Sequence, residues 1–185
     1  NVYAKSEKEG QKLLYQDVII NEDGSMKVRE ALWLNGDYNG TNRNIKFKNY
    51  WSYPFTGIYS NFSGESDIYN ATDITDLKVF DISQSNFNSY ESMYNLESEF
   101  KHVENAKKGK YGVYTLEKRA SEYNVSIYCP DKQKKVIYME YTINNAVVVH
   151  NDIAELYWCF AETKEFLEDY KLVVHLPMED ENMMI

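Results

Sequence analysis

A histidine and two carboxylates, His150, Asp152 and Glu155, lie close together in the sequence. Such a group can carry out acid–base catalysis or hold a metal ion. The spacing matches neither H-x-x-x-H nor H-E-x-x-H, the patterns that bring histidines to one metal. An acidic residue followed three positions later by glutamate is instead typical of a helix start, where side chains cap free backbone N–H groups. We therefore expect structural roles and assign no catalytic, metal-ligating or cofactor-binding residue.

Other patterns with chemical meaning are weak. The sequence contains neither a glycine-rich phosphate loop nor a G-x-S-x-G elbow. Asp37, Asn39 and Asn42 resemble part of a calcium loop, but the closing acidic residue is missing, which favours a turn. Cys129 and Cys159 lack a second ligand at metal-binding spacing and lie in apolar segments, where a free thiol packs as a small hydrophobe. A bridge between these two cysteines remains open.

Composition narrows the class of partner. The chain has 185 residues with 20 basic and 29 acidic side chains, a formal net charge of -9. Such a charge argues against nucleic acid and anionic lipid surfaces as main partners. Hydrophobic residues make up 43% of the chain, which excludes wholesale disorder. No apolar run approaches the roughly 20 residues needed to span a bilayer.

The segment that must position His150 joins a strand to a helix. Residues 136–143 alternate between apolar and polar side chains, which is the period of a strand with one buried face. Apolar residues continue over 147–149. Beyond Asp152 the apolar side chains recur at helical spacing, which predicts a short helix over residues 152–160. Tyr157 and Trp158, carried by this helix, are expected to pack on the core as structural residues.

The remaining sequence indicates strands at hairpin spacing. Residues 14–34 predict a hairpin whose turn is Asn21-Glu22-Asp23-Gly24. Further strands are predicted over residues 45–47, 68–82, 111–118, 125–129 and 170–176. Roughly nine strands without a βαβ rhythm favour a mainly β fold, an antiparallel β-sandwich of the immunoglobulin-like or jelly-roll-like kind. We expect a single domain over residues 1–185, with an inserted loop region over 83–110.

Three segments together carry a family resemblance: LLYQDVIINEDGSMKVREALWL, NGTNRNIKF, and YTINNAVVVHNDIAELYWCF with KLVVHLP after it. They resemble the bacterial predicted membrane proteins grouped as domain of unknown function 2207. The positions that match the pattern of this family are Asp23, Gly24, Ser25, Val28, Glu30, Arg43, Tyr141, Ile143, Asn145, Ala146, Val147, Asp152, Ala154, Glu155, Leu156, Tyr157, Trp158, Leu176 and Pro177.

The resemblance implies an extracytoplasmic domain that follows a signal sequence and precedes transmembrane helices. It carries over no catalytic residue and no cofactor. We therefore expect a non-catalytic interaction or structural module, anchored in the cell membrane by segments outside this sequence, with a protein or a cell-wall glycan as partner. A glycan-binding or carbohydrate-active domain that uses the aromatic residues 50–64 is the alternative. In the parent protein, an apolar segment of about 20 residues is expected beyond Ile185.

Overall fold

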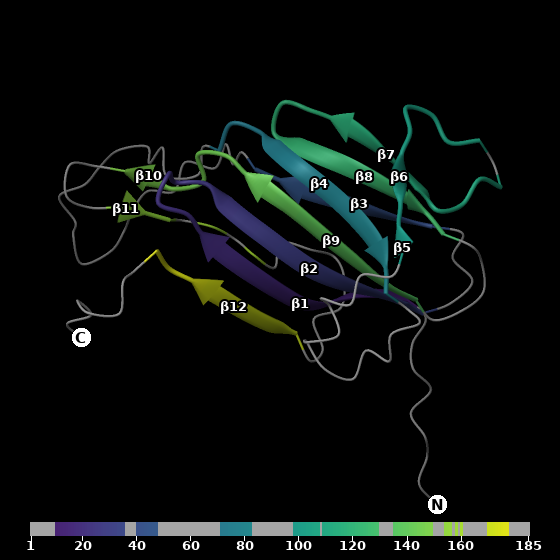
Figure 1. Ribbon diagram of the computed structural model, residues 1–185, viewed down its shortest axis with the longest axis horizontal. Helices are drawn as coiled ribbons and strands as arrows, with labels where there is room; N and C mark the ends of the chain where they lie inside the picture. The colour runs from purple at the N-terminus through teal and green to yellow at the C-terminus, as the bar shows by residue number, and fades with distance from the viewer. Residues whose placement is uncertain are drawn as a thin grey trace, which may run out of the picture.

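The computed structural model of the chain describes residues 10–35, 40–47, 71–82, 98–107, 109–129, 135–149, 154–156, 158, 160 and 170–177. Within these residues the protein is mainly β, as the sequence predicted, with a six-stranded sheet, a four-stranded sheet and a two-stranded ribbon (Figure 1). No helix occurs in the described part of the chain.

The larger sheet contains the most regular strands. Its strands, in spatial order, are β12 (Lys171–His175), β1 (Gly10–Ile20), β2 (Met26–Asn35), β9 (Lys135–Ile143), β4 (Ile74–Asp81) and β5 (Ser98–Glu99). Four of its five pairings are antiparallel, but β12 runs parallel to β1. The predicted all-antiparallel arrangement is therefore wrong at this edge. Alternation along a strand reports which side is buried, but carries no information on the direction of the neighbouring strand.

The smaller sheet is also mixed. Its order is β3 (Thr41–Lys46), β8 (Glu122–Tyr128), β7 (Val113–Lys118) and β6 (Lys101–His102), with β6 parallel to β7. The short strands β5 and β6 both lie inside residues 83–110, where the sequence predicted a loop region.

The short helix predicted over residues 152–160 is corrected by the structure. Ala154–Glu155 form strand β11, which pairs antiparallel with β10 (Val148–Val149). The intervening Asn151-Asp152, outside the described residues, suits a turn by its composition as well as it suits a helix cap. Pairing with residues 148–149 is a contact between segments, which the local spacing of apolar side chains does not reveal.

The β1–β2 hairpin follows from its turn. Asp23 accepts hydrogen bonds through Oδ1 from the Ser25 backbone N–H at 2.9 Å and from the Ser25 hydroxyl at 2.6 Å. Gly24 has a φ of +80°, a conformation that glycine adopts without steric cost. The Val147 N–H donates to the Gly24 carbonyl at 3.0 Å, so the turn is tied to the chain that follows β9. The predicted hairpin is confirmed.

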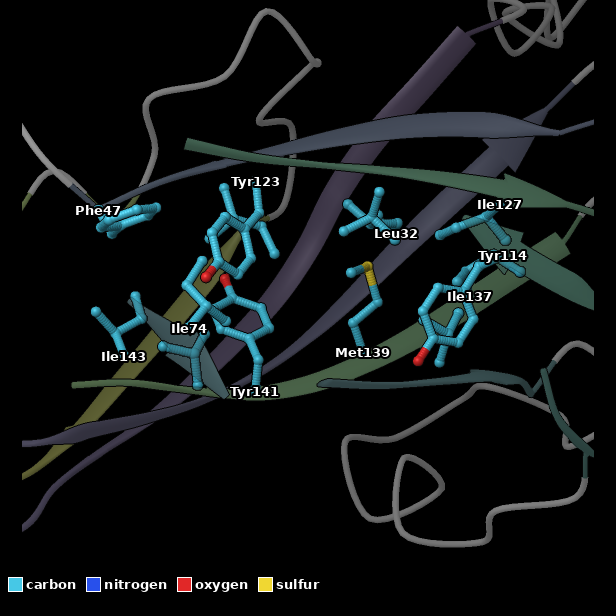
Figure 2. Packing of buried hydrophobic residues seen from close by; sticks show 14 of the residues in the cluster. Leu32, Phe47, Ile74, Tyr114, Tyr123, Ile127, Ile137, Met139, Tyr141 and Ile143 are labelled. Carbon is cyan, nitrogen blue, oxygen red and sulfur yellow. The ribbon is translucent and has the colours of Figure 1, made fainter. Parts of the chain in front are cut away.

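Side chains from both sheets share one hydrophobic core. In Figure 2, Tyr123 and Ile127 of β8 point toward Tyr141 and Met139 of β9, and all four are buried. Phe47 packs edge-on against Tyr123, with ring centroids 5.2 Å apart. Burial of this many apolar side chains is the dominant favourable contribution to folding.

Strand β9 is buried more completely than its alternation indicated. The side chains of Ile137 and Met139 lie in the shared core, but Val136 and Tyr138 are also buried, in a second cluster on the opposite face of the large sheet. Phe80 of β4 contributes to this second cluster, with its ring 5.7 Å from that of Tyr138. The prediction of a single buried face is therefore wrong for this part of β9, because the central position of the strand gives it neighbours on both sides.

Candidate functional site

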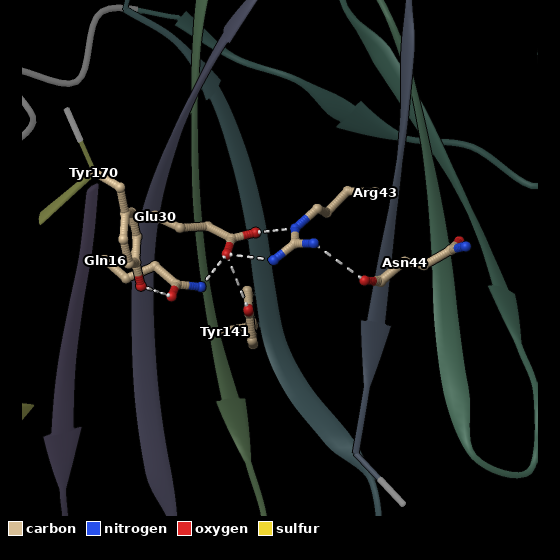
Figure 3. A network of polar contacts seen from close by, with 6 residues as sticks. All are labelled: Gln16, Glu30, Arg43, Asn44, Tyr141 and Tyr170. Atoms are coloured by element: carbon tan, nitrogen blue, oxygen red, sulfur yellow. Dashed lines mark hydrogen bonds and ion pairs between the residues drawn. The ribbon is translucent and has the colours of Figure 1, made fainter. Parts of the chain in front are cut away.

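A buried ion pair joins the two sheets. Glu30 of β2 is fully buried, and Arg43 of β3 is 6% exposed. Arg43 donates from Nε to Glu30 Oε1 at 2.8 Å and from Nη2 to Glu30 Oε2 at 3.1 Å (Figure 3). This two-point geometry is the strongest form of a carboxylate–guanidinium contact. The pair therefore sets how the strand β3 lies over the strand β2.

Three neighbouring side chains complete the network around Glu30. Gln16 Nε2 donates to Glu30 Oε2 at 2.8 Å, and the Tyr141 hydroxyl donates to the same oxygen at 3.3 Å. The Tyr170 hydroxyl donates to Gln16 Oε1 at 2.6 Å, which fixes the orientation of the amide. The network thus runs from the residue preceding β12 through the core to the smaller sheet.

The network keeps Glu30 ionised. Burial by itself raises the pKa of Glu30, but the positive charge of Arg43 and the hydrogen bonds from Arg43, Gln16 and Tyr141 outweigh it, so the pKa of Glu30 is lowered from 4.5. Burial, and then the charge of Glu30, raise the pKa of Tyr141 well above 10.0. Among the described residues no buried side-chain polar atom lacks a hydrogen-bond partner. This carboxylate is therefore satisfied and enclosed, out of reach of a substrate.

A second polar group lies on the opposite face of the large sheet, next to β12. His175 Nε2 lies 2.6 Å from Asp17 Oδ1, and Arg29 Nη1 lies 3.4 Å from Asp17 Oδ2. The Asp17 side chain is 4% exposed, whereas that of His175 is 54% exposed. The three residues border an open recess of about 430 Å³, which is lined by Tyr15, Asp17, Ile19, Arg29, Val173 and His175.

The chemistry available in this recess is limited. Because a carboxylate only accepts hydrogen bonds, the contact with Asp17 requires the proton of His175 to be on Nε2. Nδ1 of a neutral His175 is then a proton acceptor. The lining residues include no serine, threonine, cysteine or lysine that a histidine could activate. In the described part of the chain, no group of three histidine, cysteine or acidic residues could hold a metal ion. The polar groups that line the recess can form hydrogen bonds with a ligand.

The edge strand β12 exposes a row of apolar side chains. Leu172 is 37% exposed, Val174 38% and Leu176 62%. Leu172 and Val174 lie in register with Gln16 and Val18 of β1, whose side chains are buried. The face of the large sheet that carries Gln16 and Val18 is therefore buried at β1 but open to solvent at β12.

The structure describes only some of the residues around His150 that the sequence singled out. His150, Asp152 and Tyr157 lie outside the described residues. The helix-capping role predicted for Asp152 is not supported, because Ala154–Glu155 form the strand β11. Glu155 belongs to β11, in register with Val148. Trp158 is half-buried and packs against the shared core, in keeping with a structural role.

Cys129 is a buried free thiol whose pKa is raised by burial. Cys159 lies outside the described residues. The aromatic residues 50–64 also lie outside them, so the glycan-binding alternative remains a prediction.

The Asp17–His175 pair could not be recognised in the sequence, because 158 positions separate the two residues. Only the parallel pairing of β12 with β1 brings them together. The buried network had a signal in the sequence, since Glu30, Arg43 and Tyr141 all belong to the pattern that carries the family resemblance. The pattern contained these residues but did not indicate that they meet.

Comparison with known proteins agrees with the resemblance. The family model described as the predicted membrane protein (DUF2207) N-terminal domain matches residues 14–185. Neither a curated protein nor a solved structure gives a significant match. Among the described residues no helix is long and apolar enough to cross a membrane. The family model covers nearly the whole chain, and the chain therefore belongs to the DUF2207 family of predicted membrane proteins, as its N-terminal domain.

Proposed function

We propose that this chain is a non-catalytic interaction module on the extracytoplasmic side of a membrane protein, built as a β-sandwich from its two sheets. The family description supports a membrane protein. The hydrophobic core shared by both sheets supports the sandwich. Membrane attachment is supplied by segments outside this sequence, and the partner is another protein.

Binding is favoured over chemistry by the positions of the polar groups. Glu30 and Arg43 are enclosed in the core and satisfied by each other. The Asp17–His175 pair faces an open recess whose described lining residues include no serine, threonine, cysteine or lysine for the histidine to activate. The buried pair therefore supports a structural role, and the pair at the recess supports a role in binding.

The observation that carries the proposal is the exposed edge of the large sheet. Strand β12 presents Leu172 and Val174 to solvent, and Leu176 follows directly after the strand; each of the three is more than a third exposed. Edge strands of soluble proteins are usually protected, because their unpaired backbone groups and apolar side chains invite association with another chain. An apolar edge strand of this kind is typical of a binding surface.

The side of the membrane on which the domain lies can be tested in cells that make the full-length protein. Glu117, whose side chain is 61% exposed, is replaced by cysteine in a Cys159→Ser background, in which Cys129 is buried. A membrane-impermeant maleimide should label Glu117→Cys in intact cells, and the parent without this cysteine should remain unlabelled. Labelling only after the cells are lysed would contradict the extracytoplasmic placement.

The interaction role can be tested with a photo-crosslinking amino acid at position 174 or 117 of the same protein. A discrete covalent product is expected from position 174, on the apolar edge, and none from position 117, on the strand β7 of the smaller sheet. Products from both positions, or from neither, would show that β12 is not a specific interaction surface.

A further inference from the structure

We infer that β12 opens and closes on β1 as a separate unit while the other strands of the large sheet stay paired, and that its closing is coupled to the buried contact between Gln16 and Glu30. The strand then has two states at the edge of the sheet, closed on β1 and open. Both properties depend only on contacts within the chain and are independent of the proposed interaction role.

Little packing holds β12 in place. None of its five residues is buried, whereas most residues of the central strand β9 are. Leu172 and Val174 are exposed, Val173 is half-buried against the cluster that contains Tyr15, and Lys171 lies 5.9 Å from the Tyr15 ring. No buried member of either hydrophobic cluster belongs to β12. Elements with few buried apolar contacts open at a lower free energy than the whole protein unfolds.

The large sheet remains connected without β12. This strand is the outermost one, and its strand partner within the described ranges is β1 (Figure 1). On its other side, β1 is antiparallel to β2 from Gly10 to Ile20, with one bulge between Leu13 and Tyr15. The strand β2 pairs in turn with β9. Opening at the parallel edge pair, the slightly weaker kind of pairing, therefore leaves the antiparallel pairs intact.

Two side-chain contacts, one at each end of β12, tie it to consecutive residues of β1. Tyr170, directly before the strand, donates to Gln16 Oε1 at 2.6 Å. His175, the last residue of the strand, lies 2.6 Å from Asp17 Oδ1. Because neighbouring residues of a strand point to opposite faces, Gln16 and Asp17 hold β12 from the two faces of the sheet. Both contacts exist only when the strand is closed.

The Tyr170 contact links β12 to the buried network. The Gln16 amide, which accepts from Tyr170 through Oε1, donates through Nε2 to Glu30 Oε2 at 2.8 Å. When β12 opens, it withdraws the hydroxyl that orients this amide, so the bond from Gln16 to Glu30 is weaker in the open state. Coupling of this kind is reciprocal, and an intact bond between Gln16 and Glu30 therefore favours the closed state.

The test is native-state hydrogen exchange of the complete 185-residue chain, followed by NMR at low concentrations of urea. The β12 amides that bond to β1 should exchange at least about tenfold faster than the central amides of β9. Their exchange should depend little on urea, because a local opening exposes little surface. Exchange of β12 at the rate and with the urea dependence of β9 would show that the strand opens only by global unfolding, and would overturn the inference.

Variants of the two side-chain contacts test what holds the closed state. Tyr170→Phe and His175→Ala each remove one hydrogen bond and should speed β12 exchange about fivefold. His175→Gln, whose side-chain amide can still donate to Asp17, should recover most of the change seen in His175→Ala. Val174→Thr is the matched control, because this exposed residue of β12 takes part in neither contact, and it should change β12 exchange by at most about twofold. Equal exchange in all four variants would overturn the role of the two contacts.

The coupling has its own readout in the side-chain amide protons of Gln16, which is 3% exposed. His175 contacts Asp17 on the face of the sheet opposite to Gln16. His175→Ala should nevertheless speed exchange of the Gln16 side-chain amide by about the same factor as exchange of the β12 backbone, because both depend on opening of the strand. Val174→Thr should leave this exchange unchanged within about twofold. Faster exchange of β12 in His175→Ala with an unchanged Gln16 side chain would overturn the coupling.

Discussion

Replacing Arg43 by methionine should cost the domain about 3–5 kcal/mol of unfolding free energy, the range seen when one member of a buried ion pair is removed. Arg43 is 6% exposed, and its guanidinium makes two short contacts with the fully buried carboxylate of Glu30. Methionine occupies a similar length of chain but leaves this carboxylate without its positive partner. The loss would be a large part of the 5–15 kcal/mol that typical domains have.

The magnitude can be measured by urea denaturation followed by circular dichroism at neutral pH. Asn42→Ala is the matched control, because Asn42 precedes Arg43 in β3 and is exposed, and it should change stability by at most about 0.5 kcal/mol. The double variant Glu30→Met with Arg43→Met should recover much of the loss, since it removes both charges together. Similar stabilities for Arg43→Met and Asn42→Ala would refute the reasoning.

The pH dependence provides a second check. The folded protein holds the pKa of Glu30 below 4.5, so its contribution to stability is complete above that pH and is lost as the pH falls through the lowered value. In Arg43→Met the burial of Glu30 remains without its main compensating charge, which makes protonation easier. The difference in unfolding free energy between wild type and Arg43→Met should therefore shrink as the pH falls toward 4.5, where the variant takes up its proton, and shrink further below it as wild type does. A difference that stays constant into the acid range would show that Glu30 is not the group affected.

Three further changes test other parts of the structure. Gly24→Ala and Gly109→Ala both place a side chain at positive φ, but of these two positions only Gly24 brings the new Cβ close to a backbone oxygen, at 3.2 Å. In urea denaturation, Gly24→Ala should therefore lower the unfolding free energy by about 1 kcal/mol or more, and by more than Gly109→Ala does. Tyr170→Phe removes the 2.6 Å hydrogen bond to Gln16 and should cost about 1 kcal/mol, with faster amide hydrogen exchange in β12. Trp158→Ala should lower the unfolding midpoint and reduce the unfolding free energy by at most about 3–5 kcal/mol, because the indole is half-buried against the core. An unchanged midpoint would show that the indole contributes no packing.

Local patterns were sufficient for the strands whose partners lie nearby in the sequence. The turn at Asp23 and Gly24 predicted the β1–β2 hairpin, because its side-chain acceptor and positive φ are properties of a few consecutive residues. The same kind of reasoning was wrong at residues 154–155. There the apolar spacing suits a helix, but pairing with residues 148–149 produces a strand.

The sequence alone determined the mainly β class, the β1–β2 hairpin and the family, since alternation, turn chemistry and motif residues are all local. Glu30, Arg43 and Tyr141 were visible as members of the family pattern, but only the tertiary structure shows that they meet in one buried network. Asp17 and His175 carried no local signal at all, because their contact depends on the parallel pairing of β12 with β1. The direction and order of strands follow from which long-range pairings bury the most apolar surface and satisfy the most polar groups. That balance is a property of the whole chain, which no short segment contains.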